Sequence, residues 1–254
     1  MNSIKIRSFA VRTAKEILRD PLSYIFALGF PVVMLIIMTI VNESIPPEAG
    51  MDIFRIQKLA PGVVVFGYTF VMLFTTILVS KDRCSAFVDR MQAAPVTGGQ
   101  YLAGYMVPIV VLGMMQCLIT YGAAVVIGLF SGESLNIAGL GISMILLIPA
   151  LVMFTSLGVI FGCLLSEKAA PGVSSVLITA ASILGGVWMD IKAVGGVLYD
   201  IASWLPFMPA VELARGAVTG TGDSQVQYLV ITLGYAAAAV VLASAVFAKK
   251  TGRK

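Results

Sequence analysis

Six long runs of apolar residues, separated by short polar segments, dominate this sequence. They cover residues 22–41, 61–80, 101–130, 137–165, 171–189 and 226–248. Each run approaches or exceeds the roughly 20 residues that a helix needs to cross about 30 Å of hydrocarbon. The alternation typical of barrel strands is absent, and a backbone in lipid must satisfy its own hydrogen bonds. We therefore predict an all-α integral membrane protein, in which residues 1–254 form one domain with six transmembrane helices.

The composition excludes a soluble protein. Hydrophobic residues make up 59% of the chain and charged residues only 12%, whereas soluble domains carry about 25% charged residues. The sequence has no histidine, and its three cysteines have no paired spacing. We therefore expect no zinc site and no other bound metal.

Basic residues are distributed unevenly between the loops. If the N-terminus lies in the cytosol, thirteen of the seventeen basic residues fall on the cytosolic side, and only Arg55, Lys58, Lys192 and Arg215 fall outside. Cytosolic loops of membrane proteins are enriched in Lys and Arg. We therefore predict that both termini are cytosolic. The basic excess then reflects orientation in the membrane and does not indicate nucleic-acid binding.

The N-terminal residues 3–20 have the pattern of an amphipathic helix. Ile6, Phe9, Ala10, Thr13, Ala14 and Ile17 share one face, and Arg12, Lys15 and Arg19 lie on the opposite face. Asp20 precedes Pro21 and ends the pattern, because the residue before proline is disfavoured in a helix. We expect this helix to lie at the membrane interface, where its basic face meets anionic lipid headgroups or an acidic partner surface. It serves as a topological anchor, as a docking element, or as both.

A charged segment, residues 82–92, lies between the second and third apolar runs. Asp82 is positioned to cap a short helix running to about Gln92, before the sequence from Ala94 to Gly99 turns the chain back into the membrane. On that helix Phe87 and Met91 share one face, and the polar residues around it are Asp82, Arg83, Asp89 and Arg90. A short helix tied directly to two spans transmits displacement. The alternative is an ordinary solvated loop.

Residues 191–209, before the last apolar run, are mostly apolar but too interrupted by Gly and Pro to span a membrane. We predict one or two short helices that dip into the outer leaflet as a re-entrant segment. The aromatic residues Trp188, Tyr199, Trp204 and Phe207 are expected at the membrane interface. This segment either gates an exit path or only closes a gap in packing.

Small residues and prolines within the spans predict local geometry. Gly158 and Gly162 are four residues apart and allow another helix to approach closely. Pro31, Pro108 and Pro149 are expected to kink their helices.

The sequence lacks the motifs of enzymes and of ion-coupled carriers. None of the six runs has an ionisable residue near its centre, where coupled carriers place one. There is no G-x-S-x-G elbow, no pair of intramembrane aspartates and no phosphate-binding loop, because no Lys follows a Gly. We therefore expect no enzymatic activity and no cofactor in this chain, so that any pumping would be energised by another chain.

This layout resembles the membrane (permease) subunit of type-2 ABC exporters of bacteria. The resemblance rests on the basic N-terminal helix, the six spans, the Ala60-Pro61-Gly62 sequence, the segment ending in Ala94-Pro95-Val96-Thr97, and the re-entrant segment before the last span. The sequence departs from the family at Cys84-Ser85-Ala86, where a Gly-Thr pair is usual, and at Tyr105-Met106, where a basic residue is common.

The resemblance implies a permease in the bacterial cytoplasmic (inner) membrane. It would form a homodimer, or a heterodimer with a similar permease, bound to two cytosolic ABC ATPase subunits that hold ATP and Mg. Residues 82–92 would act as the coupling helix, with Phe87 and Met91 in a groove of the ATPase. Polar contacts would come from Asp82, Arg83, Asp89 and Arg90, and Arg12, Lys15 and Arg19 would brace the same interface.

The expected function is ATP-driven export of a small amphipathic or hydrophobic substrate such as a drug, peptide or lipid. An aliphatic interior with few aromatic stacking faces favours such cargo over saccharides. The alternatives are an uncoupled lipid scramblase or channel, and a non-transporting membrane scaffold or immunity protein.

Overall fold

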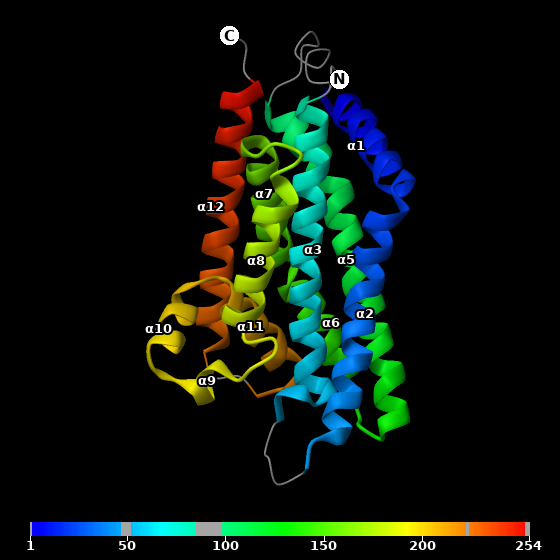
Figure 1. Ribbon diagram of the computed structural model, residues 1–254, viewed down its shortest axis with the longest axis vertical. Helices are drawn as coiled ribbons and strands as arrows, with labels where there is room; N and C mark the ends of the chain where they lie inside the picture. Colours follow the sequence, from blue (N-terminus) through cyan, green and yellow to red (C-terminus); the bar gives the residue numbers. More distant parts are fainter. Residues whose placement is uncertain (1, 47–51, 85–97, 222–223, 252–254) are drawn as a thin grey trace.

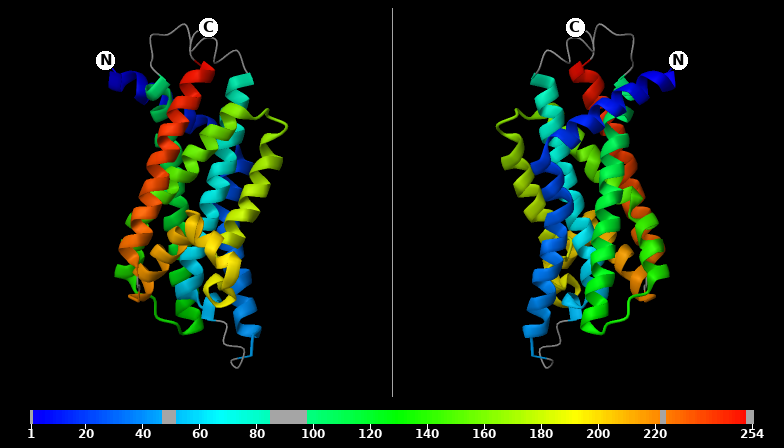
Figure 2. Two further views of the ribbon diagram at one scale, coloured as in Figure 1. Left: turned by 90° about the vertical axis from the view of Figure 1, so that its left-hand side faces the viewer. Right: turned by 90° about the vertical axis from the view of Figure 1, so that its right-hand side faces the viewer.

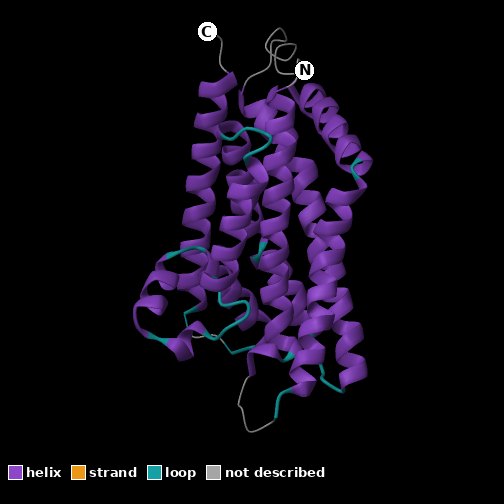
Figure 3. Ribbon diagram, viewed as in Figure 1, coloured by secondary structure: helices purple, strands orange, loops and turns teal. Residues whose placement is uncertain are grey.

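Helices form nearly all of the computed structural model, which describes residues 2–46, 52–84, 98–221 and 224–251. Within these ranges every regular element is helical (Figure 3). The long helices run roughly parallel to the long axis of the molecule (Figure 1). Their bounds are α2 Pro21–Ser44, α3 Ile56–Cys84, α5 Gly98–Ser131, α6 Ile137–Leu146, α7 Ile148–Leu164, α8 Ala170–Leu184 and α12 Gln225–Thr251.

Five segments of the described chain are long and apolar enough to cross a membrane. They are Tyr24–Ser44, Ile56–Cys84, Leu102–Ser131, Ile137–Leu164 and Gln225–Lys249. The all-α membrane architecture is thereby confirmed. The predicted fifth span, 171–189, corresponds to α8, which has 15 residues and is about 22 Å long at 1.5 Å per residue. A sixth span therefore depends on α8 and stays a prediction.

The fourth apolar run is divided into α6 and α7 at Leu147. Pro149 lies in the first turn of α7 and has no N–H to donate to the carbonyl of Ile145 four residues earlier. A kink was predicted at Pro149, and the structure shows the helix divided just before it. By contrast, α2 and α5 continue through Pro31 and Pro108 as single helices.

Helix α3 is the central helix of the bundle, because most of it is buried whereas α2 and α12 are mostly exposed. Its closest neighbour is α7. A Cβ atom at Gly158 would lie 2.6 Å from Thr75 Cβ and 2.7 Å from the Met72 carbonyl oxygen, and one at Gly162 would lie 2.6 Å from Val79 Cβ. The glycine pair therefore allows the close approach of two helix backbones that its spacing predicts.

Gly158→Ala is expected to lower the stability of the protein by about 1–3 kcal/mol, because the added methyl group overlaps the α3 backbone. Gly141→Ala is the matched control, since nothing lies within 4 Å of a Cβ atom at Gly141. The midpoint of thermal unfolding in detergent measures both variants. Equal midpoints would show that α3 and α7 separate easily at this point.

The helix α1, Asn2–Arg19, crosses one end of the bundle obliquely (Figure 2). The last turn of α12 lies at the same end, which we call the terminal end, and the opposite end is the distal end (Figure 1). The predicted apolar face of α1 packs on α5: Thr13 is fully buried, and the ring of Phe9 contacts the ring of Tyr105 edge to face at 4.8 Å. The amphipathic N-terminal helix is thus present, and part of its face is covered by protein.

Short helices occupy the distal end. They are η2 Asp52–Phe54, α9 Ile191–Val194, α10 Gly196–Trp204 and α11 Phe207–Thr219. Helix α11 packs against α6 so closely that a Cβ atom at Gly139 would lie 2.5 Å from the carbonyl oxygen of Ala217. Helices α9 and α10 stand at the side of the bundle (Figures 1 and 2).

Candidate functional site

A buried carboxylate, that of Asp82, joins three helices at the terminal end. Arg12 of α1 donates from Nη1 to Oδ2 at 2.6 Å and from Nη2 to Oδ1 at 2.7 Å. The hydroxyl of Tyr105 of α5 donates to Oδ2 at 2.6 Å. Glu16 adds a second carboxylate at 2.7 Å from Arg12 Nη2. We call Arg12, Glu16, Asp82 and Tyr105 the terminal cluster.

Asp82 does not begin a new helix, and that part of the sequence prediction was wrong. Helix α3 continues to Cys84, so that Asp82 lies in its last turn and is only 2% exposed. It is drawn inward because Arg12 and Tyr105 supply charged and neutral donors that offset the cost of burying a carboxylate. The other predicted coupling residues, Phe87, Asp89, Arg90 and Met91, lie outside the described residues.

Arg83 bonds to a different helix from its neighbour Asp82. Its Nη2 donates to the carbonyl of Leu165 at 2.7 Å, and its Nη1 donates to the carbonyl of Cys163. These carbonyls belong to the C-terminal end of α7, which carries a partial negative charge and lacks intrahelical partners. Arg83 was predicted to make polar contacts around the coupling helix, and the structure shows it tying α3 to the end of α7.

The electrostatics of the terminal cluster follow from its pairing. The hydrogen bond to Asp82 raises the pKa of Arg12 despite partial burial. Burial raises the pKa of Glu16, and the charge of Asp82 raises that pKa further. Glu16 therefore binds a proton more readily than an exposed glutamate does, whereas Arg12 stays charged.

A cavity of about 850 Å³ lies beside the terminal cluster, between α1, α3 and α5. Its apolar lining comes from Val11, Ile17, Val71, Phe74, Ile77, Leu78, Ile109 and Leu112. Its charged lining comes from Arg12, Lys15, Glu16, Arg19, Asp20, Lys81 and Glu167. Lys15 and Arg19, predicted to lie on the basic face of α1, are exposed. The cavity therefore offers charge and apolar surface to the same ligand.

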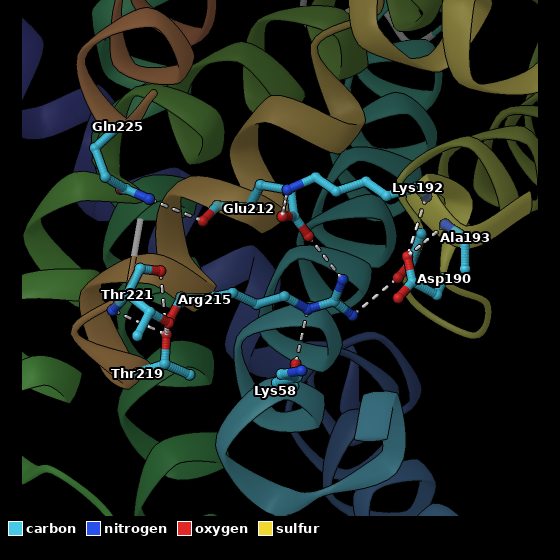
Figure 4. A network of polar contacts seen from close by, with 10 residues as sticks. Lys58, Asp190, Lys192, Ala193, Glu212, Arg215, Thr219, Thr221 and Gln225 are labelled. Carbon is cyan, nitrogen blue, oxygen red and sulfur yellow. Dashed lines mark hydrogen bonds and ion pairs between the residues drawn. The ribbon is translucent and has the colours of Figure 1, made fainter. Parts of the chain in front are cut away.

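A second polar network lies at the distal end around Arg215 of α11 (Figure 4). Its Nε donates to the carbonyl of Lys58 at 3.0 Å, its Nη2 to the carbonyl of Gly186 at 2.8 Å, and its Nη1 to Glu212 Oε1 at 3.1 Å. Arg215 is buried, and burial lowers its pKa against the opposing effect of Glu212. One side chain thus holds α11 to the start of α3 and to the turn after α8.

Glu212 also binds residues 191–209, the segment predicted to be re-entrant. Lys192 of α9 donates from Nζ to Glu212 Oε2. Burial is the largest single influence on the pKa of Lys192 and lowers it, but the hydrogen bond and the charge of Glu212, together with Tyr228, outweigh burial, so that the pKa is raised overall. Asp190 caps α9 by accepting from the N–H groups of Lys192 at 3.0 Å and Ala193 at 3.2 Å (Figure 4). We call Lys192, Glu212 and Arg215 the distal clamp.

Sequence reasoning placed Arg215 and Lys192 outside the cell but gave them no role. A local signal was available, because Glu212 and Arg215 are three residues apart and follow Pro209, so that they pair on one helix face. The contact with Lys58, 157 residues away in sequence, left no local signal.

The chain matches a known protein family over most of its length. The family described as ABC-2 type transporter matches residues 5–219. The chain belongs to this family. Its match includes the terminal cluster and the distal clamp, and it stops before α12. Comparison with curated protein sequences gives no significant match.

Membership establishes this ABC-2 protein as an integral, multi-pass permease subunit of an ABC transporter. Such a permease carries no nucleotide-binding domain and associates with an ABC ATPase subunit. No group of His, Cys, Asp and Glu residues suited to a metal ion occurs in the described parts of the permease.

The four aromatic residues predicted to form an outer gate do not meet in this permease. Trp188 packs against Phe66 at 5.1 Å between ring centroids, and Phe207 stacks on Phe154 at 5.9 Å. Tyr199 packs against the small cluster of Ile191, Ala202 and Met208. Trp204 is 80% exposed. Three of these residues therefore pack at separate points, and the four do not form a single constriction.

Proposed function

We propose that this permease exports a small amphipathic or hydrophobic substrate, such as a drug, peptide or lipid-like molecule, from the cytosol. The observation that carries the proposal is the cavity beside the terminal cluster, which is lined by both apolar and charged side chains. An amphipathic molecule can satisfy both kinds of lining at once, whereas an ion or a sugar leaves the apolar lining hydrated.

The proposed assembly places the terminal end in the cytosol of a bacterial cell, below the cytoplasmic membrane. Two permeases, identical or similar, bind two ABC ATPase subunits, and the ATP and Mg are held by those subunits. The excess of basic residues at the terminal end supports this orientation. The exposed Lys15 and Arg19 are then available to the ATPase or to anionic lipid headgroups.

We infer a route by which movement of the ATPase reaches the spans. Phe87, Met91, Asp89 and Arg90 contact the ATPase in this proposal. The chain leaves α3 directly after Asp82 and Arg83, which bond to different helices. A displacement of the segment after Cys84 would therefore act on α1 and α5 through Asp82, and on α7 through Arg83.

The exit in this proposal lies at the distal end, beneath the re-entrant segment. The distal clamp holds α11 to the ends of α3 and α8 and closes the bundle there. Opening requires α11 to separate from at least one of these helices, and the free energy for this separation comes from ATP on the partner subunit.

Transport in inverted vesicles tests the proposal. The permease and its ATPase are reconstituted together, and uptake of the amphipathic dye rhodamine 6G is followed. We expect uptake that requires ATP, and Phe87→Asp should reduce it more than about tenfold, as for loss of an interface hot spot. Gln92→Asp introduces the same charge on another face of the predicted helix and is the control.

Two outcomes would contradict the proposal. Dye that crosses equally without ATP would identify a passive conduit, such as a scramblase or channel. Absence of dye movement, with an ATPase activity that the permease does not alter, would identify a scaffold. A control ATPase subunit, in which the phosphate-binding lysine is replaced, shows whether dye uptake requires ATP hydrolysis or only the presence of the ATPase subunit.

A further inference from the structure

A groove of about 590 Å³ runs between the end of α10 and the side of α12. Its lining includes Trp204 of α10 and Val230, Ile231, Gly234, Tyr235 and Ala238 of α12. This volume falls within the roughly 300–1,000 Å³ typical of small-molecule sites. None of the residues that line the groove is ionisable at neutral pH, and its polar side chains are those of Ser203, Gln227 and Tyr235, so that the groove suits an uncharged, mostly apolar ligand.

One hydrogen bond fixes where the end of α10 lies along α12. The hydroxyl of Tyr235 donates to the carbonyl of Trp204 at 2.8 Å. Tyr235 lies ten residues after Gln225, the first residue of α12, which is about 15 Å along the helix. The end of α10 is therefore held beside the part of α12 that is long and apolar enough to cross a membrane. There a free carbonyl is costly, and the tyrosine satisfies one of the carbonyls left unpaired at the end of α10.

The groove is continuous with a surface that faces hydrocarbon. Trp204 is 80% exposed, Val230 62% and Val226 76%, and Val241 further along α12 is 65% exposed. Because α12 is one of the helices able to span the membrane, we expect its exposed side to contact lipid chains. Trp204 and Val230, which line the groove, are themselves part of this exposed surface.

We propose that this groove binds one acyl chain of a phospholipid from the distal leaflet. The chain lies along Val230, Gly234 and Ala238 with the indole of Trp204 over it. The bound lipid fills the space that the re-entrant segment leaves beside α12 and so fixes α10 against the bundle. The proposal requires only that the chain spans a membrane, and it does not depend on the transport activity.

Gly234 allows a sharp test, because nothing lies within 4 Å of a Cβ atom at this position. The side chain of Gly234→Leu therefore starts from open space, and we expect it to fill the groove. Gly122→Leu is the matched control, since Gly122 is exposed on α5 and its Cβ position is equally open. Should Gly234→Leu prevent folding, Ala238→Leu narrows the same groove.

The full-length protein is reconstituted in vesicles of phosphatidylethanolamine and phosphatidylglycerol that contain a diazirine-bearing phosphatidylethanolamine. After irradiation, mass spectrometry locates the lipid adducts. We expect adducts concentrated on the peptides that contain Trp204 and residues 230–238. Gly234→Leu should reduce them about tenfold, as for loss of about two methylene contacts, and Gly122→Leu should leave them unchanged.

Three results would overturn the proposal. One is labelling of the groove peptides no stronger than that of the rest of α12. Another is equal labelling in Gly234→Leu and the unmodified protein. The third is a crosslink between Trp204 of two copies of the chain that excludes lipid, because the groove would then be a protein interface.

Discussion

Asp82→Ala should lower the free energy of unfolding by about 3 kcal/mol and abolish ATP-driven transport. The variant leaves Arg12 and the hydroxyl of Tyr105 without their shared acceptor. The expected loss is at the low end of the range for a broken buried ion pair, because the Arg12 side chain is 33% exposed. Transport stops because α1 and α5 are released from the end of α3.

A double-mutant cycle separates this effect from general damage. Arg12→Ala and Asp82→Ala, alone and together, are compared by thermal unfolding in detergent. We expect a coupling free energy of about 1–3 kcal/mol between the two residues. The exposed neighbour Lys81→Ala should change stability by less than about 0.5 kcal/mol. Additive effects of the two main substitutions would mean that the ion pair does not hold α1 on the bundle.

Arg215→Met should destabilise the protein by about 3–5 kcal/mol, as expected when one partner of a buried charged group is removed. It deprives Glu212, the carbonyl of Lys58 and the carbonyl of Gly186 of a donor. Methionine keeps much of the side-chain length, so that the loss reports the guanidinium. Arg215→Lys should recover little, because an ammonium lacks the planar fork that reaches three acceptors.

Arg55 provides the control at the same end of the molecule. It pairs with Asp52 at 3.1 Å, but its side chain is 64% exposed, and such surface pairs contribute about 0–1 kcal/mol. Limited proteolysis of the re-entrant segment gives a second measurement. Faster cleavage within α9 and α10 is expected for Arg215→Met only. Equal cleavage in Arg55→Met would show that the distal clamp does not hold this segment.

Local patterns in the sequence predicted most of the helices. The helix over residues 3–20 could be predicted because its apolar residues recur with helical period, and α1 ends at Arg19, directly before Asp20 and Pro21. The spans could be predicted because lipid requires long apolar runs. The division at Leu147 follows from Pro149. These features depend on residues that are close together in the chain.

The polar networks could not be predicted in the same way. Asp82 follows an apolar run and has the local pattern of a helix cap, but it is turned inward by Arg12, 70 residues earlier. Tyr105 was noted only as an uncharged substitute for a basic residue, and its hydroxyl proves to be a donor to Asp82. The exposure of Trp204 could not be predicted either, because it depends on tertiary structure. Tyr235 donates to the carbonyl of Trp204, while the Trp204 ring stays exposed.

The interruption at Leu147 divides the fourth apolar segment into two helices that can move separately. Helix α6 is seated on α11 through Gly139, and α7 is seated on α3 through Gly158 and Gly162. Each half thus packs against a different helix, and the turn at Leu147 between the two halves lacks one backbone hydrogen bond. A tilt of α11 can therefore move α6 with it, while α3 and α7 keep their positions relative to each other.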